Sequence, residues 1–298
     1  MRILVTDGLS PRGIEVLRQT EKFEVDVRQR LSSDALLACI DNYDGLIVRS
    51  ATKVTAPILQ TTRRLKVVGR AGVGVDNVDV EAATARGILV MNAPSGNTLT
   101  TAEHTFSLLL ALAKNVPQAT ASMKGGRWEK GVFLSVEVAG KTLGVIGLGR
   151  IGSEVARRAK GFAMRVIAFD PFISEEAAKA LGVELVEIPD LFRRSDFISI
   201  HTPLTPETHH LVDGKAIAQM KPGVRIVNCA RGGIIDEAAL AEALKTGKVA
   251  GAALDVFEQE PITSSPLFGL SNFICTPHLG AASEEAQENV AVEIAQQV

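Results

Sequence analysis

The most informative segment of the chain is Gly147-Leu148-Gly149-Arg150-Ile151-Gly152, because its glycine spacing suits one particular structural setting. It follows the apolar run Thr142–Ile146 and precedes Glu154-Val155-Ala156, which is typical of a helix. In a strand–turn–helix unit, Gly147 permits a tight turn, Gly149 lets a pyrophosphate approach, and Gly152 lets helix and strand pack closely. The sequence therefore predicts a dinucleotide site at the N-terminus of this helix.

An acidic residue follows at the position where such sites bind a ribose. The next predicted strand ends in Phe169-Asp170-Pro171, about 20 residues beyond the last glycine. A carboxylate there accepts hydrogen bonds from the adenosine ribose hydroxyls and repels a 2′-phosphate. Neither Pro171 nor Phe172 supplies a compensating cation, so NAD is favoured over NADP. The alternatives are an ordinary glycine turn and a plain strand-end turn residue at Asp170.

Short β-branched runs recur along the whole chain with helical stretches between them. They are apolar throughout and do not alternate, as expected of strands buried on both faces of a parallel sheet. The first set comprises residues 3–6, 46–49, 67–69 and 89–92, and the second comprises residues 142–146, 166–170, 197–201, 224–229, 250–256 and 272–276. We therefore expect an α/β protein with two open parallel sheets, Rossmann-like or flavodoxin-like, with flanking helices and a cleft between them.

The length of 298 residues suits two domains. We expect a discontinuous substrate-binding domain, residues 1–96 plus 282–298, and an NAD-binding Rossmann domain, residues 97–281. Between the two sets of strands, the helical segment 101–115 and the glycine-containing passage 123–128 are typical of a connector and a subunit contact. Hinges near Asn97 and Ala281 would let the cleft close on the cofactor.

Composition argues against several other classes of protein. Lysine plus arginine (32) nearly balances aspartate plus glutamate (34), so charge favours neither nucleic acid nor an anionic membrane as a partner. The most apolar run, residues 106–113, is well short of the roughly 20 residues that span a bilayer. Cys39, Cys229 and Cys275 are isolated and have no clustered histidines nearby, so we expect no metal site and a reducing, cytoplasmic setting.

Three polar residues stand near the carboxyl ends of later predicted strands, where open α/β sheets place their ligands: Arg231, Glu260 and His278. Oxidation of a 2-hydroxy acid needs a cation for the carboxylate and the developing carbonyl, and a base for the hydroxyl proton. Arginine and histidine suit these tasks, and a carboxylate beside the histidine would raise its pKa. Each residue also has an ordinary alternative, as a helix cap or salt bridge (Arg231), a solvated loop charge (Glu260) or a turn residue (His278).

Longer strings around these residues resemble the signatures of D-isomer-specific 2-hydroxyacid dehydrogenases, and the resemblance runs essentially the whole length of the chain. The strings are Asn228-Cys229-Ala230-Arg231-Gly232-Gly233, residues 251–261, and Thr276-Pro277-His278-Leu279-Gly280. Within that family, residues 68–77, 119–124 and 228–233 are most similar to members that act on 3-phospho-D-glycerate. The resemblance implies that Arg231 binds the substrate carboxylate and carbonyl, that His278 is the general acid/base, and that Glu260 is its partner.

The motif, the resemblance and the positions of strand-end loops together give two expected sets of binding residues. The cofactor set comprises Gly147, Gly149, Arg150, Ile151 and Gly152 at the pyrophosphate, Asp170 at the ribose, His201, Thr202 and Pro203 on the adenosine side, Cys229, Ala230, Arg231 and Asp255 on the nicotinamide side, and His278 and Gly280. The substrate set, from loops of the first domain, comprises Arg49, Ser50, Arg70, Gly72, Val73, Gly74 and Asn97.

Two arginines of the first domain and the histidine at the end of a middle strand can also be interpreted. Arg49 and Arg70 can bind phosphate oxygens by bidentate hydrogen bonds, or can instead form surface ion pairs. We interpret His201 as a wall of the cofactor pocket and not as a base, because it ends a middle strand before Thr202-Pro203. The remaining histidines, His104, His209 and His210, have no comparable setting.

By resemblance, the expected reaction is the NAD-dependent oxidation of 3-phospho-D-glycerate to 3-phosphohydroxypyruvate, the first step of phosphorylated serine biosynthesis, in a homodimer or higher homo-oligomer. One alternative is a dehydrogenase for another D-2-hydroxy acid, such as glycerate or lactate. The other is a non-catalytic, NAD-sensing scaffold like the corepressors that resemble this family. Members that act on the phosphorylated substrate often carry C-terminal regulatory domains that bind serine, and we expect none in the residues up to Val298.

Overall fold

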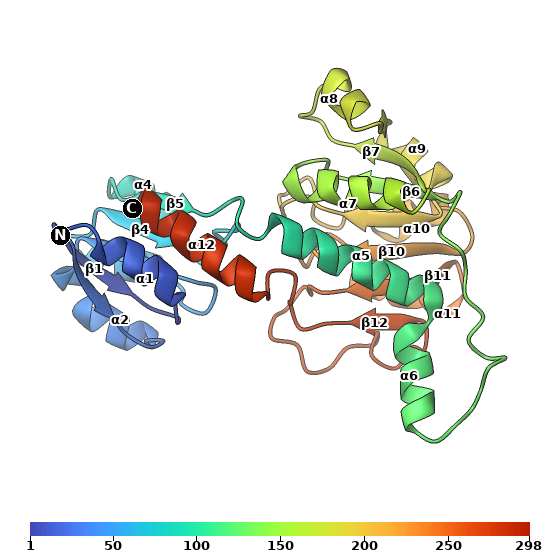
Figure 1. The fold of residues 1–298 in the computed structure, drawn as a ribbon, viewed down its shortest axis with the longest axis horizontal. Helices are drawn as coiled ribbons and strands as arrows, with labels where there is room; N and C mark the ends of the chain where they lie inside the picture. The colour runs from blue at the N-terminus through green and yellow to red at the C-terminus, as the bar shows by residue number, and fades with distance from the viewer. The chain divides into compact units, whose positions relative to one another are not determined.

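Parallel strands form two separate sheets in the computed structural model, which describes residues 1–298 (Figure 1). The chain divides into two compact units. Unit 1 comprises Met1–Thr100 and Ala281–Val298, and unit 2 comprises Thr101–Gly280. The sheets have five and seven strands, so the predicted α/β class with two open parallel sheets is confirmed.

Unit 1 contains the five-stranded sheet, ordered β2-β1-β3-β4-β5, with every pair parallel. Its strands are β1 (Arg2–Val5), β2 (Glu24–Val27), β3 (Gly45–Val48), β4 (Val67–Arg70) and β5 (Leu89–Asn92). Its helices are α1 (Pro11–Arg18), α2 (Ser33–Cys39), the 3-10 turn η1 (Ile40–Asn42), α3 (Ala56–Thr61), α4 (Val80–Ala85) and α12 (Glu284–Gln297). The strand order reverses between β1 and β3, and open sheets of this kind bind ligands at the carboxyl ends beside such a point.

Both faces of the unit 1 sheet are covered, because its central strands carry apolar side chains on both sides. Ile3 and Val5 pack with α1 and α12, whereas Leu4, between them, packs with α2 and α3. Figure 1 shows the C-terminal helix α12 in red beside the N-terminal helix α1 in blue. The last residues of the chain therefore complete the core that the first residues begin.

Unit 2 contains the seven-stranded sheet, ordered β12-β11-β10-β9-β6-β7-β8, again with every pair parallel. Its strands are β6 (Thr142–Ile146), β7 (Arg165–Phe169), β8 (Glu184–Leu185), β9 (Phe197–Ile200), β10 (Val224–Asn228), β11 (Val249–Leu254) and β12 (Phe273–Cys275). Its helices are α5 (Thr98–Lys114), α6 (Val116–Lys124), α7 (Arg150–Gly161), α8 (Glu175–Ala180), α9 (Ile188–Arg194), α10 (Gly214–Gln219) and α11 (Glu237–Lys245). The strand order reverses between β6 and β9, beside the glycine turn.

Two apolar layers enclose the unit 2 sheet. Helices α5 and α7 pack on one face, around Leu143, Val145 and Val227, and α9, α10 and α11 pack on the other, around Ile198 and Ile226. Of all the helices in the chain, none combines the length and the apolar character needed to cross a membrane.

Three elements differ from the predicted pattern. Strand β2 reads Glu-Val-Asp-Val and lies at the sheet edge, where one side is open to water, so it lacks the continuous apolar run used to recognise the other strands. Strand β8 has only two residues. A single residue, Asn115, separates α5 from α6, and its left-handed conformation with φ 54° breaks the helix there. Helix α6 includes residues 123–124, which were predicted to belong to the connector.

A glycine at the contact between α1 and α12 allows a test of this packing. A Cβ added to Gly13 would lie 2.6 Å from the backbone oxygen of Ala291. We therefore expect Gly13→Ala to lower the free energy of unfolding by about 1–3 kcal/mol through overpacking, as measured by urea denaturation. The control is Gly161→Ala in α7, where a Cβ would meet nothing within 4 Å and where alanine should add at most about 1 kcal/mol. Equal stability of the two variants would contradict the close approach of the helices.

Candidate active site

The glycine turn between β6 and α7 has a different steric requirement at each glycine. Gly147 has φ +90°, a conformation that L side chains rarely adopt. A Cβ at Gly152 would lie 2.0 Å from the carbonyl oxygen of Gly147, so helix and strand could not pack this closely with any side chain there. Gly149, the N-cap of α7, has nothing within 4 Å of its Cβ position. The turn thus leaves open space at the end of a helix whose first amides have no partner within the helix.

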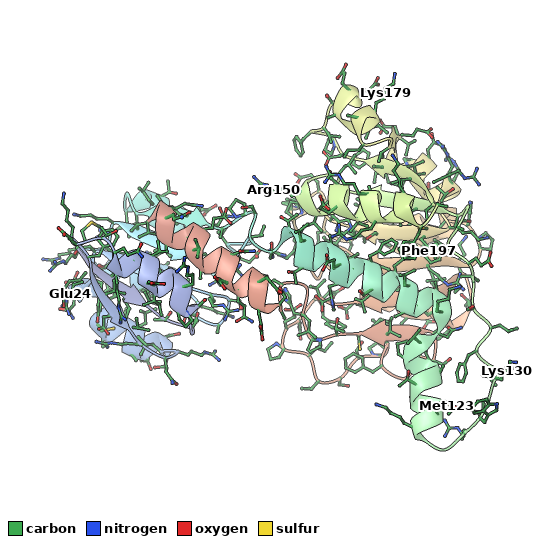
Figure 2. The ribbon with its side chains drawn as sticks, viewed as in Figure 1. Glu24, Met123, Lys130, Arg150, Lys179 and Phe197 are labelled. Atoms are coloured by element: carbon green, nitrogen blue, oxygen red, sulfur yellow. The ribbon has the colours of Figure 1, made fainter.

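Asp170 fixes this turn from the end of the neighbouring strand. Its Oδ2 accepts a hydrogen bond from the Leu148 amide at 2.7 Å, and its Oδ1 accepts one from the Phe172 amide at 2.8 Å. Each carboxylate oxygen can accept a second hydrogen bond, so capacity for ribose hydroxyls remains. Arg150, at the first position of α7, is exposed beside the same turn (Figure 2).

The residues that follow β9 suit the adenosine half of a dinucleotide. The hydroxyl oxygen of Thr202 is buried without a hydrogen-bond partner, next to Gly147, so it is available to a ligand at the turn. The ring of His201 contacts the buried Ser199 hydroxyl, with 2.8 Å between Nε2 and Oγ, and burial lowers the pKa of His201 to about 3. A histidine that binds a proton this weakly suits a pocket wall, because a general base needs a pKa near the working pH. The open space, the orphaned hydroxyl and Asp170 together fit a dinucleotide.

At the carboxyl end of unit 2's sheet, a histidine and a carboxylate form a close pair. The Nδ1 of His278 lies 2.6 Å from Oε2 of Glu260. This hydrogen bond is the main cause that raises the pKa of His278, and it leaves Nε2 for a substrate. Burial raises the pKa of Glu260, but the hydrogen bonds from His278 and the Phe257 amide outweigh that effect and lower it overall.

Arg231 lies close enough to act on this pair electrostatically. Its positive charge lowers the pKa of His278 and so opposes part of the effect of Glu260. Its Nη1 donates to the carbonyl of Ala230 at 2.7 Å, and Asn228 binds the Arg231 carbonyl at 2.9 Å. A Cβ at Gly232 would lie 1.8 Å from the Phe257 carbonyl oxygen, so this loop packs directly on the one that leads to Glu260. The structure thus brings Arg231, Glu260 and His278 together, although they are far apart in sequence.

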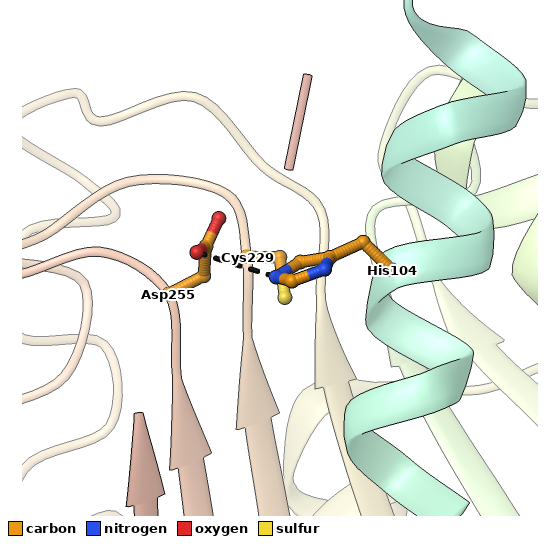
Figure 3. Close-up of side chains that lie close together, drawn as sticks. All are labelled: His104, Cys229 and Asp255. Carbon is orange, nitrogen blue, oxygen red and sulfur yellow. Dashed lines mark ion pairs between the residues drawn. The ribbon is translucent and has the colours of Figure 1, made fainter. Parts of the chain in front are cut away.

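Asp255 and Cys229 are buried, whereas the His278–Glu260 pair is partly exposed. The Asp255 side chain is fully buried, and its oxygens accept hydrogen bonds from Thr276, Leu279 and Gly280. Burial raises the pKa of Asp255, yet these bonds and His104 lower it overall. Figure 3 shows His104 reaching from α5 toward Asp255, with 3.3 Å between its Nε2 and Oδ1. Sequence reasoning gave His104 no setting, because no local motif links helix α5 to the end of β11.

The side chains of His104, Cys229 and Asp255 offer three ligand atoms within 4.8 Å of one another, a spacing that a metal ion could use. Two observations favour a hydrogen-bonded cluster instead. Burial raises the pKa of the Cys229 thiol to about 12, whereas a metal binds the thiolate. Asp255 also already accepts hydrogen bonds from three donors in the segment that follows β12, besides its contact with His104.

In unit 1, the predicted substrate residues lie at or after the ends of β3 and β4, which are neighbouring strands, except Asn97, which comes after β5. Asp7 anchors the loop that carries Arg49 and Ser50 by accepting from the Arg49 and Thr52 amides at 3.0 and 2.9 Å. A Cβ at Gly72 would lie 1.7 Å from Nη1 of Arg70, so this guanidinium rests on the glycine backbone. The other predicted residues are Val73, whose carbonyl accepts from Asn92 at 2.6 Å, Gly74, and Asn97, which is buried with an unpartnered Oδ1.

Replacement of Glu260 tests the coupling within the pair. Glu260→Gln removes the carboxylate that favours the charged imidazole, so the pKa of His278 should fall, and an NMR titration of the His278 ring measures this directly. The matched control is Glu258→Gln, which removes the carboxylate 3.1 Å from the exposed His210 and should leave the pKa of His278 unchanged. An unchanged pKa in the Glu260 variant would show that the 2.6 Å contact does not control the base.

Comparison with known proteins identifies the family. A family model described as D-isomer specific 2-hydroxyacid dehydrogenase, NAD binding domain, matches residues 106–280. D-3-phosphoglycerate dehydrogenase of Methanocaldococcus jannaschii is 53% identical over 299 residues, covering 100% of this chain and 57% of that protein. The chain spans about half the length of the curated relatives it matches.

Solved structures give the same result. The TT0316 protein of Thermus thermophilus superposes with a TM-score of 0.90 at 37% identity, covering 99% of this chain and 94% of that one. D-lactate dehydrogenase of Aquifex aeolicus, complexed with NAD and lactic acid, has a TM-score of 0.85 at 29% identity, covering 99% and 93%. The family suggested by the sequence is therefore confirmed: this chain belongs to the D-isomer specific 2-hydroxyacid dehydrogenases, and residues 106–280 match their NAD binding domain.

Proposed function

We propose that this chain catalyses the NAD-dependent oxidation of 3-phospho-D-glycerate to 3-phosphohydroxypyruvate, the first step of phosphorylated serine biosynthesis. The observation that carries the proposal is the His278–Glu260 pair, held beside Arg231 at the same sheet edge as the dinucleotide turn. Relatives at about half identity over the full chain are named D-3-phosphoglycerate dehydrogenase, which favours this substrate. We place the reaction in a reducing cytoplasm, since the three cysteines are free.

In the proposed reaction, Arg231 binds the substrate carboxylate and polarises the oxygen on C2. Nε2 of His278 removes the hydroxyl proton as the carbonyl forms, and Glu260 stabilises the resulting imidazolium through Nδ1. Bound NAD supplies the acceptor for the hydride that leaves C2. The first turn of α7, with Gly149, Arg150 and Ile151, would hold the pyrophosphate, and Asp170 the ribose.

The phosphate of the substrate requires cations that a simpler 2-hydroxy acid does not. We assign this role to Arg49 and Arg70, which follow or end neighbouring strands of unit 1. The backbone at Gly72, Val73 and Gly74 would approach the substrate carboxylate closely, since the two glycines carry no side chain. Guanidinium groups suit phosphate because they donate two parallel hydrogen bonds.

An assay of NADH formation with 3-phospho-D-glycerate tests the proposal directly. We expect turnover with NAD and much weaker turnover with NADP, because Asp170 repels a 2′-phosphate. A chain that binds NAD but oxidises none of 3-phosphoglycerate, glycerate and lactate would instead be a sensing scaffold, and one that prefers glycerate or lactate would act on a simpler acid.

Arginine variants can distinguish a phosphorylated substrate from a simpler 2-hydroxy acid. Arg49→Ala or Arg70→Ala should raise the KM for 3-phosphoglycerate roughly 10- to 100-fold, the size expected for a lost charged hydrogen bond, and should spare activity on glycerate. Arg12→Ala, which removes an exposed arginine paired with Glu15 on α1, is the control and should change neither. Equal losses on both substrates would remove the support for phosphate binding by Arg49 and Arg70.

We also propose that the chain forms a homodimer through the segment between α6 and β6. This segment exposes large apolar side chains, with Trp128 80%, Val132 70% and Leu134 83% exposed, and such surfaces mark subunit contacts. Analytical ultracentrifugation should show a dimer that Trp128→Glu together with Leu134→Glu converts to monomer. A monomer without substitution, at micromolar concentration, would overturn this assignment.

A further inference from the structure

The catalytic histidine of the proposed reaction sits on a strained backbone. His278 has φ 55°, in the left-handed region that residues other than glycine seldom occupy. Such a conformation persists only where the surrounding structure holds it in place. The main-chain amide of His278 donates to the carbonyl oxygen of Asp255 at 2.9 Å and to that of Thr276 at 3.1 Å. The support of this turn therefore centres on Asp255.

The carboxylate of Asp255 binds the two residues that follow His278. Oδ1 accepts from the Leu279 amide and Oδ2 accepts from the Gly280 amide, both at 2.7 Å. A Cβ at Gly280 would lie 3.1 Å from Oδ2, so glycine is what lets the backbone come this close. Asp255 thus holds the turn from 278 to 280 at three consecutive amides, and a shift of its carboxylate would move the His278 ring.

A fully buried carboxylate needs compensating donors from the rest of the structure. Thr276 provides one, since its hydroxyl donates to Oδ1 of Asp255 at 2.5 Å. That hydroxyl has then used its only hydrogen, so the 3.1 Å contact between His104 Nε2 and Thr276 Oγ1 must be donated by the histidine. The same Nε2 lies 3.3 Å from Oδ1 of Asp255. His104 is therefore a donor to both partners, and it carries its hydrogen on Nε2.

We propose that His104 is a positioning residue, which holds Asp255 and through it the turn that presents His278 to the substrate. His104 comes from helix α5, and Figure 3 shows its ring beside Asp255, which follows β11. Because Thr276 follows β12, the contact ties a helix to two strand ends. The ring touches no reacting atom in this proposal. Its effect travels along the path His104, Thr276, Asp255, and then the amides of Leu279 and Gly280.

Hydrogen exchange of those two amides tests the proposal without any assay of activity. His104→Leu removes the donor, whereas His104→Gln keeps a side-chain N–H at about the reach of Nε2. We expect exchange at Leu279 and Gly280 to accelerate about tenfold or more in the leucine variant, as suits a lost hydrogen bond to a charged acceptor, and to change little in the glutamine variant. His210→Leu, which breaks the exposed His210–Glu258 pair, is the matched control and should have no effect there.

Thr276→Val provides a second route should the leucine variant fail to fold, because valine is nearly the same shape and only the hydroxyl is lost. The same two amides should exchange faster in it. Unchanged exchange in His104→Leu or in Thr276→Val would overturn the proposal. Equal acceleration in the leucine and glutamine variants would also overturn it, since ring shape and not the donor would then matter.

A kinetic comparison extends the test and rests on the proposed function. With 3-phosphoglycerate, His104→Leu should lower kcat about tenfold with KM nearly unchanged, and His104→Gln should restore most of the loss. A larger change in KM than in kcat would contradict a role in positioning the base. If the unsubstituted chain oxidises no 2-hydroxy acid, the proposed function fails, whereas the exchange experiment still decides whether His104 holds the turn.

Discussion

The parallel direction of the strands is the constraint on which the rest of this molecule depends. Because all strands in a sheet point the same way, each residue that follows a strand reaches the same edge. In unit 2 that edge receives the glycine turn after β6, Asp170 after β7, His201 after β9, Arg231 after β10 and Asp255 after β11. Residues separated by many tens of positions in sequence thereby share one surface, and short loops are enough to complete a site.

At that edge, two carboxylates act on His278 in different ways. Glu260 contacts the His278 ring and raises its pKa. Asp255 binds the backbone on which that ring is mounted, and its charge also raises the pKa of His278. The positive charge of Arg231 lowers the pKa of the same imidazole. The proton affinity of His278 thus depends on three neighbours, and its position depends mainly on Asp255.

Much of this was predictable from sequence, because the informative signals are local. The glycine turn, the acidic strand end and the apolar runs each fall within a few residues, and each predicted strand of the two sets has a counterpart in the structure. Strands β2 and β8 were not predicted, since edge strands need not be apolar on both faces. The contacts of His104 were not predicted for a different reason. Its partners lie at the ends of β11 and β12, and helix α5 meets them only in the folded protein. Contacts of that kind correspond to no fixed residue spacing in the sequence.

The low pKa of His201 affects how this family member responds to acidity. With a pKa of about 3, His201 keeps the same charge through the whole range in which cells live, and so does the adenosine side of the cofactor site that it would line. The pKa of His278, by contrast, is raised from its ordinary value, chiefly by the hydrogen bond to Glu260. In the proposed reaction, protonation of this imidazole at low pH would slow proton abstraction, while the charge on the adenosine side of the cofactor site would stay the same.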